Sequence, residues 1–141
     1  MKKLSILFVV CMLLVGVMCG CGNKNNKNNV SGTEISGAES SLLNQFVTAQ
    51  QDRIPNMKAT LGDSVDIAIT AEGNSMVYRY TYTIEVDVEA KKAELQEQSI
   101  GFNQAFEDKI IEMRAAGIEN ASILVEFVAK DGAVVFSKEY K

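Results

Sequence analysis

Carboxylates are the side chains of this chain best suited to chemistry, because the sequence contains no histidine. Glu107, Asp108 and Glu112 fall close together, with Lys109 among them and Arg114 just after. Such a cluster suits a metal ion or an acid–base pair, but helical spacing with mixed charge is typical of a solvated helix face. The lack of histidine excludes zinc sites built from His and Cys, and Ser-His-Asp or Cys-His catalytic groups. We expect no catalytic residue, cofactor or metal site, and no enzyme, except for a remote alternative, a hydrolase that uses carboxylates alone.

The tyrosines offer a second set of functional groups. Tyr78, Tyr80 and Tyr82 alternate along one segment, and Tyr140 is expected opposite them on the same sheet face. They could line a groove for a ligand, or form a core in which the hydroxyls reach the sheet edge. The core interpretation is the favoured one.

The N-terminal segment has the pattern of an export signal. Lys2 and Lys3 precede an apolar run that extends from Leu4 to Met18. A basic start followed by about fifteen apolar residues is typical of a secretory signal peptide. The run is shorter than the roughly 20 residues that a membrane-spanning helix needs. We expect residues 1–20 to be a signal peptide.

The end of this run, Met18-Cys19-Gly20-Cys21, resembles the lipobox of bacterial lipoproteins. That motif has an aliphatic residue three positions before the lipidated cysteine and a small residue directly before it. Cys19 departs from the Ala or Ser usual there. The resemblance implies a diacylglycerol on Cys21, and two acyl chains anchor a protein stably in a membrane. The expected location is the extracytoplasmic face of the cell membrane; an ordinary cleaved signal peptide and an uncleaved anchor are the alternatives.

Residues 21–35 are expected to be the lipidated cysteine and a flexible polar tether, and residues 36–141 a single globular α+β domain. Asn, Lys, Gly and Ser cannot bury enough apolar surface to order the tether. Without Lys2 and Lys3 the chain has 12 basic and 18 acidic residues, a net charge of −6. No basic cluster is present, so we expect no nucleic-acid partner.

In the first half of the domain we expect a helix followed by a hairpin. Ser36 and Glu39 have capping-box spacing, and Pro55 is expected to end the helix. Strict alternation on both sides of Gly73-Asn74 then predicts two antiparallel strands. The expected cross-strand pairs, all on one face, are Val65–Tyr82, Ile67–Tyr80, Ile69–Tyr78 and Ala71–Met76.

The second half repeats this order. Asp87 is the expected cap of a long helix, Gly101 a site of kinking or close approach, and Gly117 its end. The apolar stripe of that helix comprises Val88, Leu95, Ser99, Phe102, Phe106, Ile110 and Met113. Asp131-Gly132 signals a second hairpin turn. Its expected pairs are Ile123–Tyr140, Val125–Lys138, Phe127–Phe136 and Ala129–Val134.

The predicted fold class is therefore α+β, with two helix–hairpin (αββ) units that form a four-stranded antiparallel sheet covered by two helices on one face. The two hairpins align without a gap at an offset of 58 residues. Either the unit was duplicated, or any two alternating hairpins align this well.

The sheet face away from the predicted helices is more apolar than solvation requires. It is a candidate interaction face, carried by Val77, Arg79, Leu124, Val128 and Val135. The alternative is a weakly apolar face that simply contacts solvent.

The whole chain resembles small lipoproteins of Gram-positive bacteria that carry a domain of unknown function. The lipobox, the Asn-rich tether and the hairpin segments AEGNSMVYRYTY and AKDGAVVFSKEY carry the resemblance. It implies no activity. The expected function is a non-catalytic binding or interaction module held at the membrane by the lipid on Cys21, with an envelope protein or a small ligand as partner. A structural or assembly role in the envelope is the alternative.

Overall fold

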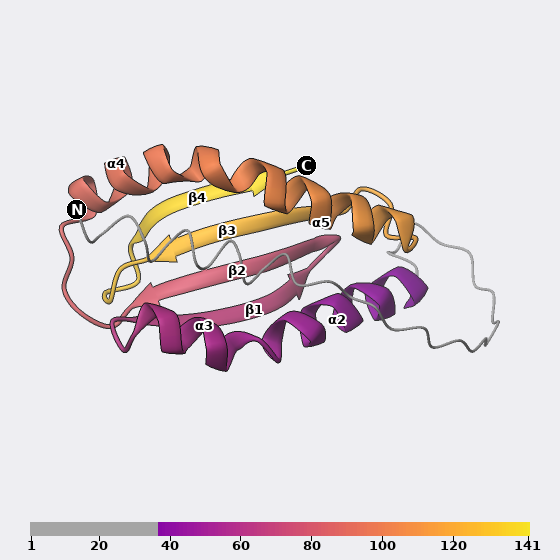
Figure 1. The fold of residues 1–141 in the computed structure, drawn as a ribbon, viewed down its shortest axis with the longest axis horizontal. Helices are drawn as coiled ribbons and strands as arrows, with labels where there is room; N and C mark the ends of the chain where they lie inside the picture. The colour runs from indigo at the N-terminus through magenta and orange to yellow at the C-terminus, as the bar shows by residue number, and fades with distance from the viewer. Residues whose placement is uncertain (1–36) are drawn as a thin grey trace.

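The computed structural model describes residues 37–141, so the predictions on residues 1–36, Cys21 among them, lie outside the described part. The fold is α+β, as predicted, with helices and strands in the expected order (Figure 1). The helices are α2 (Gly37–Gln51), α3 (Ile54–Leu61), α4 (Val88–Gln98), the 3-10 turn η1 (Ser99–Phe102) and α5 (Asn103–Ala115). The strands are β1 (Val65–Glu72), β2 (Ser75–Tyr82), β3 (Ser122–Val128) and β4 (Val134–Tyr140).

The four strands form one sheet in the order β1-β2-β3-β4, and this sheet is mixed. β1 and β2 are antiparallel, as are β3 and β4, but β2 and β3 are parallel. The prediction of a purely antiparallel sheet was therefore wrong. The reason is the long segment α4-η1-α5, which carries the chain back along the whole sheet, so that β3 begins at the end where β2 began.

The first hairpin has the predicted register. Ile69 pairs with Tyr78 and Val65 with Tyr82, and the other two expected pairs are also present. Gly73 adopts a positive φ of 59° in the turn. A glycine suits this conformation because it has no Cβ to clash.

The second hairpin has the predicted register except next to its turn. Phe127 pairs with Phe136, but the ladder shifts at Val128, which pairs with Val134, so the predicted Ala129–Val134 pair was wrong. Ala129 instead accepts a hydrogen bond from Gly132 N–H (2.9 Å) and donates one to Ala133 O (2.8 Å). Gly132 has a φ of 91°, as the left-handed position of a longer hairpin loop requires.

The first helical segment is interrupted earlier than expected. α2 ends at Gln51, and Pro55 lies in the first turn of α3 rather than ending a helix. Proline is favoured there because the first helical N–H groups have no partner within the helix. The Glu39 carboxylate accepts a hydrogen bond from the N–H of Glu119 (3.1 Å), and its predicted capping box with Ser36 falls on a residue outside the described part.

The second helical segment agrees more closely with the prediction. Asp87 caps α4 by accepting a hydrogen bond from Ala90 N–H (3.0 Å). Gly101 lies in η1, the short 3-10 turn between α4 and α5, and Gly117 follows the end of α5 with a φ of 107°. Five residues of the predicted stripe are buried, and Val88 and Phe102 pack partly buried against the core.

All the described helices cover one face of the sheet. α2 and α3 lie over β1, and α4 and α5 run along β4 and β3 (Figure 1). The core between these layers is rich in aromatic rings. Phe127 stacks on Tyr80 with ring centroids 4.7 Å apart, and it also contacts Tyr82 and Phe136.

The geometry argues against a duplicated unit. The two hairpins have the helices on the same face, yet β2 and β3, at the centre of the sheet, are parallel. Seen from the helix side, with the first strand of each hairpin pointing up, β2 lies on one side of β1 whereas β4 lies on the opposite side of β3. No rotation superposes two such units, which favours the simpler view that two alternating hairpins resemble each other.

Phe127→Ala tests the buried aromatic cluster. Its side chain is 7% exposed, so the truncation should leave a cavity and lower the free energy of unfolding by about 3–5 kcal/mol. Val134→Ala is the matched control, because Val134 is 59% exposed and should cost under about 0.5 kcal/mol. Chemical denaturation of the two variants measures the difference, and equal losses would contradict the assignment of faces.

Candidate functional site

The first candidate site is the outer face, which we define as the sheet face that no described helix covers. Its predicted residues do not share one environment. Leu124 and Val128 are half-buried and Arg79 is exposed, whereas Val77 is 0% and Val135 2% exposed. The prediction that Val77 and Val135 form part of an open surface was therefore wrong.

Val77 is buried on the outer face beside an ion-pair network. On the outer face, Val77 lies between Ser75 and Arg79 along β2, with Thr70 and Leu124 beside it. Arg79 reaches diagonally towards Glu72, with its Nη2 3.9 Å from Glu72 Oε1, so this contact crosses the position of Val77.

The same guanidinium joins β2 to β3. Arg79 donates from Nε (2.9 Å) and Nη2 (2.8 Å) to Glu126 Oε2. This hydrogen bond, together with the charge of Glu126, raises the pKa of Arg79. Because the side chain of Glu126 is only 17% exposed, the pair forms a partly shielded polar bridge beside Leu124 and Val128. The outer face is thus a half-buried apolar strip next to a charged bridge.

Val135 is buried for a different reason. It lies next to the register shift between β3 and β4 and belongs to the hydrophobic core cluster, as does Ala129 in the adjacent loop. At this irregular position of the ladder, Val135 is therefore part of the core, whereas its neighbour Val134 is exposed.

A second polar group on the outer face could not be seen in the sequence. Ser75 Oγ lies 2.6 Å from Ser122 Oγ, which donates to Glu139 Oε1 (3.0 Å). Hydrogen bonds from Lys141 and Ser122 lower the pKa of Glu139. A carboxylate with a lowered pKa is a weak base, so this chain of groups suits a polar strap between β2, β3 and β4 better than activation of a serine.

The carboxylates predicted on the long helix do not form a site. Glu107 and Asp108 are exposed, and Asp108 accepts a hydrogen bond from Gln104 (3.0 Å). Glu112 forms a 2.6 Å ion pair with Lys109. Within residues 37–141, no group of three or more His, Cys, Asp or Glu side chains could hold a metal ion. The mixed-charge helix face is therefore the interpretation that the structure supports.

The tyrosines belong to the core, as the favoured interpretation held. Tyr78, Tyr80, Tyr82 and Tyr140 are between 0% and 8% exposed. The ring of Tyr78 contacts Phe106 with centroids 5.8 Å apart, and Tyr140 lies 4.7 Å from the same ring. In the described part of the chain they line no open surface, but the hydroxyl of one of them has no hydrogen-bond partner there.

That hydroxyl is part of a polar cluster on the helix-covered face, which we call the Arg53 cluster and define as Gln50, Arg53 and Tyr78. Tyr78 OH and Gln50 Oε1 are buried and have no hydrogen-bond partner within residues 37–141. Burial raises the pKa of Tyr78 far above its usual range, Tyr80 raises it further, and the charge of Arg53 acts in the opposite direction. The hydroxyl of Tyr78 therefore stays protonated. No sequence pattern predicts the Arg53 cluster, because its members come together only when the helices pack on the sheet.

Comparison with known proteins identifies the family but no activity. No helix in the described part is both long and apolar enough to span a membrane. No curated protein and no solved structure matches the chain. A family model described as a domain of unknown function, DUF4854, matches residues 41–140, which is nearly the whole described domain. The expected domain of unknown function is thereby confirmed, and the chain belongs to the DUF4854 family.

Proposed function

We propose that this protein is a lipoprotein anchored on the extracytoplasmic face of the cell membrane, where its α+β domain acts as a non-catalytic binding module. The anchor is supported by the sequence Met18-Cys19-Gly20-Cys21 at the end of an apolar run. The lipid on Cys21 would hold the domain at the membrane, and the tether would separate the two by roughly 20 Å. The partner would be an envelope protein or a small ligand, and no basic cluster favours nucleic acid.

The observation that carries the binding role is the uncovered outer face. Within residues 37–141, all helices lie on the other side of the sheet, which leaves Leu124 and Val128 half-buried on outward positions of β3, one on each side of Glu126. Apolar side chains next to a polar rim are typical of an interaction surface. Arg79 and Glu126 provide that rim.

The pairing of the acidic groups supports a role without catalysis. Glu112 is paired with Lys109, Glu126 with Arg79 and Glu139 with Lys141. A general acid needs a carboxyl group with a raised pKa, and burial or a neighbouring like charge normally provides it. For Glu139, hydrogen bonds from Lys141 and Ser122 instead lower the pKa.

The anchor can be tested by metabolic labelling with a fatty-acid analogue. The wild type should be labelled and found in the membrane fraction, whereas Cys21→Ala should lose the label because the acylated sulfur is gone. Cys19→Ala is the matched control, since it keeps Cys21 and should remain labelled. Label that persists on Cys21→Ala, or that disappears only with Cys19→Ala, would overturn the assignment.

The outer face can be tested by placing a photo-crosslinking residue at Leu124 and, as a control, at Ile111, which is 62% exposed on α5. On intact cells, position 124 should give a discrete crosslinked species and position 111 should not. The same crosslinks at both positions, or at neither, would contradict a binding role for this face.

A third variant tests the corrected environment of Val77. Val77→Lys would bury a charge beneath the Arg79 network and should unfold or strongly destabilise the domain. Circular dichroism and a thermal melt measure this loss. Native-like stability of this variant would mean that Val77 is accessible after all.

A further inference from the structure

Three polar side chains have functional groups without a partner in the described part of the chain: Gln50 near the end of α2, Arg53 between α2 and α3, and Tyr78 on β2. Tyr78 is 0% and Gln50 2% exposed, and neither Tyr78 OH nor Gln50 Oε1 has a hydrogen-bond partner. Arg53 is half-buried and forms no hydrogen bond or ion pair through its guanidinium within residues 37–141. Buried polar groups are nearly always paired, so three unpaired groups in one region need an explanation.

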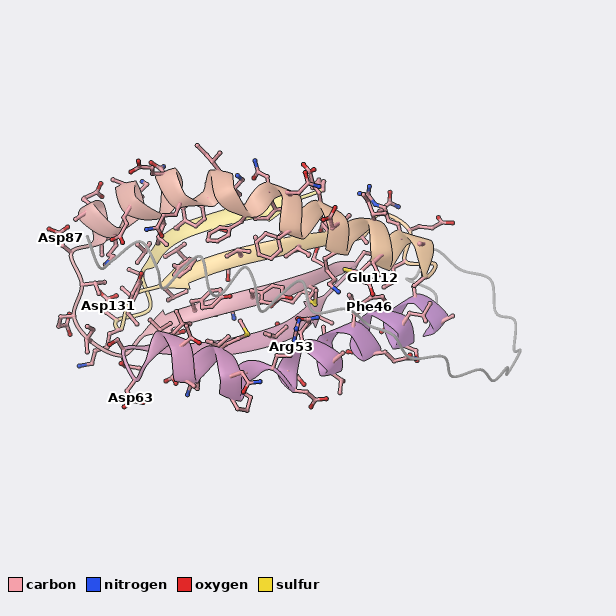
Figure 2. All side chains as sticks on the ribbon, in the orientation of Figure 1. Phe46, Arg53, Asp63, Asp87, Glu112 and Asp131 are labelled. Carbon is pink, nitrogen blue, oxygen red and sulfur yellow. The ribbon has the colours of Figure 1, made fainter. Side chains whose placement is uncertain are left out.

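The three residues lie in one region of the helix-covered face. Gln50 and Arg53 are three residues apart, which puts them on the same side of the chain as α2 ends. Gln51, next to Gln50, donates to Ile69 O (2.7 Å), and Ile69 pairs with Tyr78, so the end of α2 lies close to Tyr78. In agreement with this, the charge of Arg53 lowers the pKa of Tyr78, against the larger effect of burial. Figure 2 shows the Arg53 side chain directed from the junction of α2 and α3 towards the strands.

The backbone of the junction does not use these side chains. Arg53 N–H donates to Gln50 O (3.0 Å), and Arg53 O accepts from Met57 N–H (3.0 Å). The helix ends are therefore satisfied by main-chain groups, and the cluster is not a cap. The side-chain functional groups of the Arg53 cluster therefore take no part in the hydrogen bonds that form this junction.

The charge of Arg53 indicates which kind of ligand would suit the Arg53 cluster. The other two arginines have partners: Arg79 binds Glu126, and Arg114 donates to Ala121 O (3.2 Å). A half-buried cation without a counterion loses hydration without compensation. An anionic ligand would supply the counterion that Arg53 lacks in the described part of this acidic protein. A guanidinium matches the planar, bidentate geometry of a carboxylate.

We propose that Gln50, Arg53 and Tyr78 bind an α-carboxylate together with the N–H group next to it, as found in a free amino acid or at the C-terminus of a peptide. Arg53 and the protonated Tyr78 hydroxyl donate to the carboxylate, and Gln50 Oε1 accepts from the neighbouring N–H. Each orphaned group then has a partner of the right kind. This site lies on the helix-covered face and goes beyond the proposed binding at the outer face.

Isothermal titration calorimetry of the full-length protein in detergent tests the proposal with three probes: L-alanine, trialanine with a free C-terminus, and trialanine amide. At least one of the two free acids should bind saturably, and which one binds identifies a free amino acid or a peptide end as the source. The amide lacks the carboxylate and should bind at least tenfold more weakly than trialanine, or not at all.

Variants separate a ligand site from a structural role. Arg53→Gln and Tyr78→Phe should each weaken binding at least tenfold, while Arg53→Lys should retain part of it. Lys92→Gln removes an equal charge from an exposed position on α4, and Tyr82→Phe removes a hydroxyl from another buried tyrosine; both should bind as the wild type does. Tyr78→Phe should not destabilise the protein without ligand, because it removes an unpaired hydroxyl.

Three outcomes would overturn the proposal. The first is that neither free acid binds to the wild type at millimolar concentration. The second is binding that survives Arg53→Gln unchanged. The third is a high-resolution structure, determined with the probes present, in which only ordered water connects Gln50 and Tyr78.

Discussion

The parallel pairing of β2 with β3 is the contact on which the rest of this structure depends. A two-stranded hairpin is marginally stable alone, and this contact joins two of them into one sheet with a continuous apolar face. It places Tyr80 beside Phe127, at the centre of the aromatic cluster. It also aligns Arg79 with Glu126, and Ser75 with Ser122, on the opposite face. The register between β2 and β3 therefore determines which side chains lie next to one another on both faces of the sheet.

The two faces have different physical characters. The helix-covered face buries all four tyrosines among phenylalanine and aliphatic side chains, and this provides the stability of a domain without disulfides in its described part. The outer face is held by polar bridges across the same strands, and Val77 is buried on this face. The Arg53 cluster stands apart, because it lies on the apolar side but its polar groups have no partner there. That contrast is why we assign recognition of a ligand to it.

Local patterns in the sequence were sufficient for much of the fold. Alternation and a turn signal gave the first hairpin its correct register, and the Asp87 cap and the buried stripe of the long helix followed from helical spacing. These features depend on residues close in sequence. The break before Pro55 was missed because proline fits the start of a helix as well as the position after its end.

Features that depend on distant residues could not be predicted in this way. Whether β3 lies parallel or antiparallel to β2 depends on where the helical crossover returns the chain, and no local pattern reports that. Val77 was placed on the correct face, but its burial there, beside the ion pair of Arg79 with Glu72, could not be predicted from the sequence. The Arg53 cluster likewise combines the end of a helix with a strand some 25 residues further on.

The register between β2 and β3 can be measured most directly with paired cysteines. In the parallel register Ser75 lies opposite Ser122, so Ser75→Cys combined with Ser122→Cys should form an intramolecular disulfide on mild oxidation. Ser75→Cys combined with Val128→Cys should not, because Val128 lies opposite Thr81 at the other end of β2. A disulfide in the second pair and not in the first, detected by mass spectrometry of a digest, would show antiparallel strands and contradict this account of both faces.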